Sequence, residues 1–126
     1  MTGATLDSGA LIAFERGSGR MVALVERARS NDLRLAVPAG VVAQVWRGGG
    51  RQARLSRLLR APVTDVVDLD ELEARAVGVV CGETGAGDVV DVSVVVCARA
   101  RGHRVVSGDP DDLRAIDPSL AVLPPG

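Results

Sequence analysis

The sequence predicts an α/β fold in which helices cover both faces of a mostly parallel β-sheet, a three-layer α/β/α arrangement. Short, valine-rich apolar runs alternate with amphipathic segments along the chain, and this alternation is typical of parallel strands joined by helices. A length of 126 residues leaves room for one domain, so we expect a single domain over residues 1–126. A hydrophobic content of 47% is enough for a core and excludes intrinsic disorder.

The first half of the chain predicts two strands and three helices. The first strand runs into Ser8, which is expected to cap the helix that follows. Pro38 suits the first turn of the third helix. In the second helix, apolar residues recur at the spacing of one helical face: Met21, Leu24, Val25 and Ala28. The expected strands are 4–7 and 33–37, and the expected helices are 10–16, 20–29 and 38–46.

A basic block occupies the middle of the chain. Residues 33–64 contain no acid, whereas six arginines lie there: Arg34, Arg47, Arg51, Arg54, Arg57 and Arg60. The last five follow helical steps, and Leu55, Leu58 and Leu59 supply an apolar stripe, so we expect a further helix after the glycines at 48–50. The exposed arginine face would suit a phosphate backbone, although a solvated helix surface is the more ordinary interpretation.

The second half predicts three more helices and three more strands. Segment 88–100 is ambiguous, because its many valines favour a strand. Its length exceeds that of a usual strand and Asp88 is a good helix cap, so we predict a buried helix. The remaining expected elements are strands at 63–67, 104–107 and 120–123, and helices at 70–80 and 111–116.

The composition excludes several classes of enzyme. All fifteen basic residues are arginine, so the chain offers no lysine for a P-loop or a Schiff base. The single histidine, His103, restricts histidine triads and three-histidine zinc sites, and its polar turn predicts exposure. We expect Cys81 and Cys97 to be reduced and Trp46 to lie in the core or at a dimer contact. Lacking a membrane-length apolar run and a signal peptide, the chain is expected in the cytoplasm without a membrane partner.

Carboxylates gather where a parallel sheet places its functional residues. Asp7 and Asp109 each follow a predicted strand, and the crevice beyond the carboxyl ends of parallel strands is the usual position of a site. Asp88 and Asp91 stand one turn apart on one helix face. Carboxylates that are held together in their ionised form require a cation, and oxygen ligands favour Mg²⁺ or Mn²⁺.

Each of these acids also has a purely structural interpretation. Asp88 can serve only as a helix cap, and Asp7 and Asp109 only as turn residues at strand ends. Their joint occurrence favours the metal site. Asp111 and Asp112 are interpreted as first-turn acids, which the helix dipole favours.

Four segments, in order and at matching spacing, resemble a known family. They read LDSGALIA at 6–13, VPA at 37–39 leading to VWRG at 45–48, DVVD at 88–91, and VVSGDPDDL at 105–113. Together they are similar to the PIN-domain ribonucleases, specifically the VapC-type toxins of bacterial toxin–antitoxin modules. The resemblance covers nearly the whole chain and implies a PIN-like fold.

The resemblance also implies an activity and its residues. It implies a metal-dependent endoribonuclease toxin that hydrolyses RNA with Mg²⁺ or Mn²⁺, is silenced by a small cognate antitoxin and commonly forms a homodimer. Asp7, Asp91 and Asp109 match family acids that hold the metal. Asp88 would be an accessory ligand, and Ser107 matches a hydroxyl residue that orients the first acid.

The chain departs from the family at the second acid. The resemblance predicts a glutamate on the helix after the proline, but the residue there is Gln44. A neutral amide would hold a cation less firmly than a carboxylate, unless Asp88 restores the charge. The sequence therefore leaves open a second function, a catalytically weak or silent PIN-fold protein that binds antitoxin or RNA without cleavage. For either function, Arg47, Arg51 and Arg54 would contact RNA backbone or the acidic part of an antitoxin.

Overall fold

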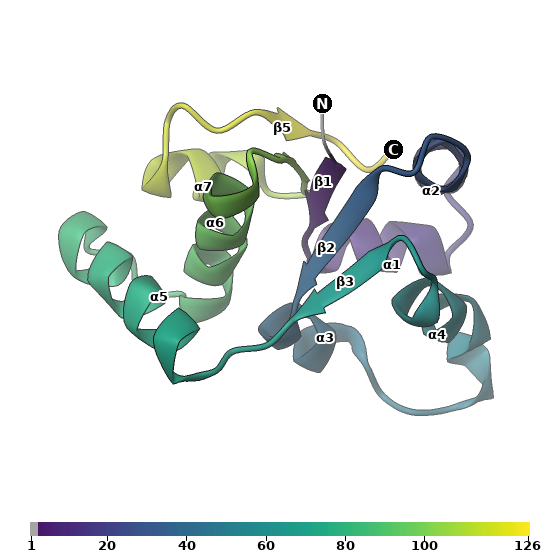
Figure 1. Ribbon diagram of the computed structural model, residues 1–126, viewed down its shortest axis with the longest axis horizontal. Coiled ribbons are helices and arrows are strands. Elements are labelled where there is room, and N and C mark those ends of the chain that lie inside the picture. The colour runs from purple at the N-terminus through teal and green to yellow at the C-terminus, as the bar shows by residue number, and fades with distance from the viewer. Residues whose placement is uncertain (1–2) are drawn as a thin grey trace.

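A computed structural model of the chain describes residues 3–126 and shows a five-stranded sheet with the strand order β3-β2-β1-β4-β5 (Figure 1). Each pair of neighbouring strands is parallel, which confirms the predicted α/β class. Because the strands are parallel, their carboxyl ends all lie at one edge of the sheet. The strands are β1 (Gly3–Leu6), β2 (Arg34–Pro38), β3 (Thr64–Val67), β4 (Arg104–Val106) and β5 (Val122–Leu123).

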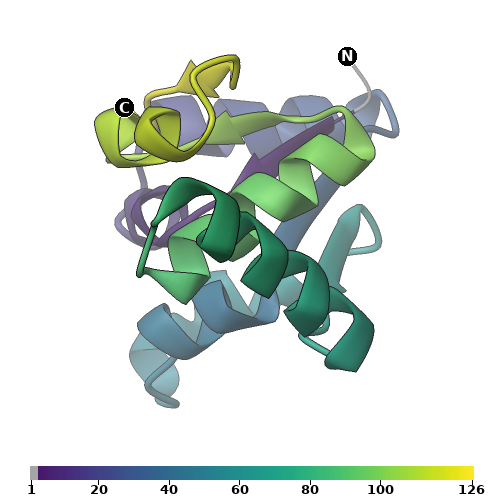
Figure 2. The same ribbon diagram turned by 90° about the vertical axis from the view of Figure 1, so that its left-hand side faces the viewer.

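Helices cover both faces of this sheet. They are α1 (Ser8–Glu15), α2 (Gly19–Ser30), α3 (Ala39–Val45), α4 (Ala53–Arg60), α5 (Glu71–Thr84), α6 (Val89–Arg101) and α7 (Pro110–Ile116), and a 3₁₀ helix, η1 (Gly50–Gln52), precedes α4. On one face, α6 packs across β1, β2 and β4, and α5 lies against the outer side of α6 (Figure 2). On the other face lie α1, α2 and α4 (Figure 1). The result is the expected three-layer arrangement.

The core lies on both faces of the central strands, against α6 on one side and against α1, α2 and α4 on the other. The side chains of Leu6, Leu35 and Val105 in the sheet are fully buried, as are Val92 and Val95 in α6. The sheet and helices α5 and α7 enclose α6. This enclosure explains why α6 is apolar on most of its surface, since a helix that is hydrophobic all round is usually buried. The valine-rich segment at 88–100 is a helix, as its length and its cap predict.

Two helices begin differently from the prediction. Asp7, not Ser8, caps α1: its Oδ1 accepts a hydrogen bond from the backbone N of Ala10 at 3.0 Å. Helix α4 begins only at Ala53, so Arg47 and Arg51 precede it. The cause is Gln52, whose buried side chain accepts hydrogen bonds from the backbone N of Arg47 (2.8 Å) and of Gly48 (3.0 Å) and thereby holds the glycine loop.

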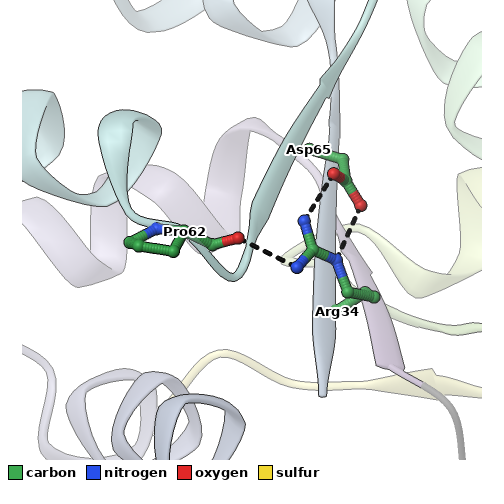
Figure 3. A network of polar contacts seen from close by, with 3 residues as sticks. All are labelled: Arg34, Pro62 and Asp65. Atoms are coloured by element: carbon green, nitrogen blue, oxygen red, sulfur yellow. Dashed lines mark hydrogen bonds and ion pairs between the residues drawn. The ribbon is translucent and has the colours of Figure 1, made fainter. Parts of the chain in front are cut away.

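An ion pair fixes the edge strand β3 to β2. The guanidinium of Arg34 donates to both carboxylate oxygens of Asp65, Nε at 3.0 Å and Nη2 at 2.6 Å, and its Nη1 donates to the carbonyl of Pro62 at 2.9 Å (Figure 3). This geometry is bidentate, the stronger form of an arginine–carboxylate contact. The pair lies at the start of β2 and β3, away from the carboxyl ends of the strands.

The environments of two residues, His103 and Trp46, differ from or refine the expectation. His103 is not exposed: it retains 9% of its accessible surface, and its Nδ1 lies 3.1 Å from Oγ1 of Thr5, because the turn packs against β1. Trp46 is 40% exposed, which excludes the core interpretation. Cys81 and Cys97 are free, as predicted. Within residues 3–126, no helix is both long enough and apolar enough to span a membrane.

Candidate functional site

Asp7 lies at the carboxyl end of β1, where the chain turns into α1. Its side chain is 8% exposed. Burial raises the pKa of this carboxyl above its ordinary value, and the charge of Asp109 adds to the rise, whereas hydrogen bonds from the Ser107 hydroxyl and the Ala10 amide oppose it. The carboxylate is therefore held in one orientation by two neighbours and is costly to keep ionised without a further positive charge.

The loop after β4 lies directly beside Asp7. Ser107 is buried, and its Oγ accepts a hydrogen bond from the backbone N of Asp109 at 2.9 Å. Gly9 and Gly108 permit this approach, because a Cβ on Gly9 would stand 3.0 Å from the backbone N of Gly108. Strands β1 and β4 are neighbours in the sheet, so the start of α1 after β1 and the loop after β4 bring Asp7, Ser107 and Asp109 together.

Asp91 contributes the third acid from the first turn of α6. Asp88 caps this helix, with its Oδ1 accepting from the backbone N of Asp91 at 3.0 Å. The pKa of Asp91 is raised to about 6, first by burial and then by the charges of Asp88, Asp112, Asp7 and Asp109. All four of these charges are negative. Asp91 therefore lies within the electrostatic field of acids from β1, α6 and α7.

The structure adds Asp112 to this group, although its position in the sequence predicts only a favourable interaction with the helix dipole. After Asp88, its charge is the next largest contribution to the raised pKa of Asp91. Helix α7 packs against α6, which explains the proximity. The available signal was the spacing from Asp109, because residues three apart at a helix start share one face.

The donor chemistry of this acidic cluster, which we define as Asp7, Asp88, Asp91, Asp109 and Asp112, fits a hard divalent cation. All of its side-chain donors are carboxylate oxygens, the ligands that Mg²⁺ and Mn²⁺ prefer. Within residues 3–126, no group of three or more His, Cys, Asp and Glu side chains is close enough together to hold a metal ion unaided. Mg²⁺ usually keeps several water ligands, so fewer than three direct carboxylates are compatible with this chemistry.

Gln44 lies on α3, which packs against α1 and α6, the two helices that begin at the acids. Its side chain is exposed. Its backbone carbonyl accepts a hydrogen bond from Nη2 of Arg47 at 2.9 Å. The position therefore lies on a helix that packs against both helices that begin at the acids, and its amide carries no charge.

The three arginines assigned to RNA or antitoxin contact have different environments. Arg47 folds back on the end of α3, where its Nη1 donates to the carbonyl of Trp46 at 2.8 Å. Arg51 is exposed. The guanidinium of Arg54 lies over Gly17, with Nη1 2.6 Å from the position of a Cβ at that glycine. Arg47 is therefore partly engaged as a helix C-terminal partner, whereas Arg51 is open to solvent.

Comparisons with known proteins identify the fold. No protein-family model matches the chain, and no curated protein matches it. Solved structures do match. VapBC2 from Rickettsia felis, bound to a DNA fragment from its promoter, has a TM-score of 0.71 and 15% identity, with 96% of this chain and 97% of that chain covered.

Two further solved structures also match over nearly the full chain at low sequence identity. A toxin–antitoxin complex from Klebsiella pneumoniae has a TM-score of 0.69 and 14% identity, covering 98% of each chain. FitAcB from Neisseria gonorrhoeae has a TM-score of 0.62 and 20% identity, covering 97% of each chain. At these identities the likeness establishes the fold, over nearly the full length of the chain.

Proposed function

The chain has the PIN-like fold of VapC-type toxins, and from this premise we propose that it is a metal-dependent endoribonuclease toxin neutralised by a cognate antitoxin. The observation that supports the proposal is that the negative charges of Asp7, Asp88, Asp109 and Asp112, beyond the carboxyl ends of the strands, all raise the pKa of Asp91. Such a concentration of carboxylates disfavours folding unless it serves a cation.

The residues of the chain would divide the work as follows. Asp7, Asp91 and Asp109, with Asp88 as an accessory, would hold Mg²⁺ or Mn²⁺ together with water ligands, some of the carboxylates acting through those waters. When bound, such an ion supplies a water of lowered pKa and neutralises charge that develops on a phosphate. Ser107 and the Ala10 amide orient the Asp7 carboxylate, because both hydrogen-bond to it. The carboxylates alone would repel RNA, so binding of the polyanion depends on that ion and on arginines such as Arg51 and Arg54.

Two protein partners belong to the proposal. The matching structures from Klebsiella pneumoniae and Rickettsia felis are toxin–antitoxin assemblies, which supports a cognate antitoxin as a partner here. A homodimer is proposed as well. Helix α5 exposes Leu72 (81%) and Val79 (61%) on its outer side, and exposed apolar side chains of this size favour contact with another protein surface.

A cleavage assay with an Asp7→Asn variant tests the nuclease proposal. Asparagine keeps the side-chain oxygen that accepts from Ala10 and so keeps the α1 cap, but removes the charge. We expect cleavage of total bacterial RNA to require Mg²⁺ and to fall by more than about a hundredfold in the variant. Asp70→Asn is the matched control, because Asp70 caps α5 in the same way, by accepting from Glu73 at 2.9 Å. Full activity of Asp7→Asn would exclude the site.

Gln44 favours a second candidate function, a silent PIN-fold module that binds antitoxin or RNA without cutting it. A neutral amide where the resemblance predicts a carboxylate lowers the affinity for a cation. Calorimetric titration with Mn²⁺ separates the two candidates. A nuclease shows a binding isotherm that disappears in Asp7→Asn, whereas a silent module shows no ion binding in either protein.

A further inference from the structure

A cavity of about 340 Å³ lies between α2 and the sheet. Its walls include Gly3 and Ala4 at the start of β1, Leu33 and Leu35 around the start of β2, and Arg104 at the start of β4. Parallel strands place these starts at the edge opposite to Asp7 and Asp109, on the side where the chain ends are drawn (Figure 1). The cavity is therefore separate from the acidic cluster, and its size falls within the range of small-molecule sites.

The cavity exists because small side chains face one another across it. In the sheet register, Ala4 pairs with Leu35 on one side and with Arg104 on the other, so these three side chains point to the same face. Opposite them, α2 presents Ala23 and Ala28. Alanines on both walls leave a space with a buried apolar floor, and Ala23 is exposed at its opening.

Three arginines line this space, and no acidic residue does: Arg20, Arg27 and Arg104. Within the described residues 3–126, none of these three arginines forms an ion pair. Arg29, on the same helix but outside the cavity, is paired with Glu26 at 3.6 Å. Unpaired guanidinium groups around an apolar floor are complementary to a ligand that has an apolar body and an anionic end.

We propose that this cavity binds a small anionic amphiphile, an aliphatic chain that ends in one carboxylate. The floor of Ala4, Leu24 and Leu35 buries the chain, and each buried methylene contributes about 0.8 kcal/mol by removal from water. The arginines bind the carboxylate with charge-assisted hydrogen bonds. A simple anion would leave the floor unused, and an uncharged chain would leave the arginines unused. The proposal does not depend on nuclease activity, because it concerns the opposite edge of the sheet.

Calorimetry of the full chain tests the ligand class. The probes are octanoate, 1-octanol with the same chain but no charge, and acetate with the charge but no chain. We expect octanoate to bind at least about tenfold more tightly than either of the other two. Equal binding of octanoate and 1-octanol would overturn the proposal, and so would the absence of octanoate binding. Binding of octanoate to the protein only when phosphatidylglycerol vesicles are present would overturn it as well.

Variants locate the binding on this cavity. Arg27→Gln and Arg104→Gln are each expected to weaken octanoate binding by about tenfold. Arg29→Gln is the matched control on α2 and should leave it unchanged. Ala23→Leu should fill the opening and abolish binding, with an unchanged circular dichroism spectrum because position 23 is exposed. A loss in Arg29→Gln equal to that in Arg27→Gln, or full binding in Ala23→Leu, would show that the cavity is not the site.

Discussion

Asp7 both caps helix α1 and supplies a carboxylate to the acidic cluster. The cap contact with Ala10 fixes the side chain, and the Ser107 hydroxyl approaches it from the neighbouring loop. The sequence predicts Asp7 as a site residue from its position after a strand, but assigns the cap to Ser8. The two roles coincide in one residue because the strand ends where the helix begins, with no intervening loop.

The crowding of acids around Asp91 predicts a pH-dependent destabilisation in metal-free buffer. The native pKa of about 6 exceeds the ordinary value of 3.8, so the folded state binds more protons than the unfolded state between these values. Stability therefore falls as the pH rises from about 4 to about 6. The shift corresponds to at most about 3 kcal/mol, and solvent screening of a partly exposed carboxylate reduces this to about 1 kcal/mol.

Asp91→Asn should accordingly raise the free energy of unfolding by about 1 kcal/mol at pH 7 and have little effect at pH 4. Urea unfolding at the two pH values, with EDTA present, measures this. Glu83→Gln, which neutralises an exposed acid at the end of α5, is the control. An Asp91→Asn variant that is less stable than the parent at pH 7 would contradict the argument.

Gln44→Glu tests whether the missing carboxylate limits the nuclease. Glutamate has the same length as glutamine and adds a negative charge beside the cluster, so we expect tighter binding of Mg²⁺ and a gain of about tenfold in RNA cleavage. The cleavage rate at several Mg²⁺ concentrations is the measurement. The control is Ala43→Glu, which adds the same charge at a neighbouring exposed position of α3. Gln52→Glu is unsuitable, since Gln52 holds the 46–52 loop. An equal gain in Ala43→Glu would mean that a general charge effect operates, and no gain in Gln44→Glu would contradict the prediction.

Among the elements, the edge strand β3 depends on its contact with β2. Strand β3 has no fully buried residue, so its attachment rests on the ladder and on the Arg34–Asp65 pair rather than on its own packing. The sequence predicts the strand from its valines, but the pairing of Arg34 with Asp65 follows only from the register, which sets Ala36 opposite Asp65.

Asp65→Asn should lower stability at neutral pH by a small amount, because both side chains of the pair are over two fifths exposed (42% and 46%) and exposed ion pairs contribute little. The Arg34 guanidinium holds the pKa of Asp65 below its ordinary value. The pair therefore contributes above the unfolded pKa, and its contribution disappears as the pH falls through the lower folded pKa.

Thermal unfolding from pH 7 down to pH 3 measures this difference between the parent protein and Asp65→Asn. Glu71→Gln is the control, since the Glu71–Arg75 pair is within one helix and 79% and 77% exposed, and should have no effect. A difference that grows at low pH would contradict the assigned direction.

At the scale of the whole molecule, a bound divalent cation should link the end of β1, the start of α6 and the β4–α7 loop through their acids. An ion that binds only the folded state stabilises it by mass action, by about 2.7 kcal/mol at a hundred times its dissociation constant. We therefore expect the Tm to rise with Mn²⁺ concentration and to return after EDTA. Asp109→Asn should reduce the rise, whereas Asp111→Asn, its exposed neighbour on α7 outside the cluster, should not. An equal rise in both variants would place the ion elsewhere.

The sequence by itself determined the order of the strands and helices, the helix at 88–100 and the candidate acids Asp7, Asp91 and Asp109. These follow from local rules: apolar periodicity, segment length, capping residues and the position of an acid after a strand. Local rules also explain the errors, since the start of α4 depends on the distant side-chain contacts of Gln52 and the burial of His103 depends on Thr5 in another strand.

Only the tertiary structure decided which of these segments meet. The placement of β1 between β2 and β4 brings Gly9 at the start of α1 against Gly108 in the loop after β4, and so places Asp7 beside Asp109. The packing of α7 on α6 adds Asp112, and the register of β1 creates the arginine-lined cavity beneath α2. The physical reason is that strand order and register join residues far apart in the chain, and no local periodicity encodes those contacts.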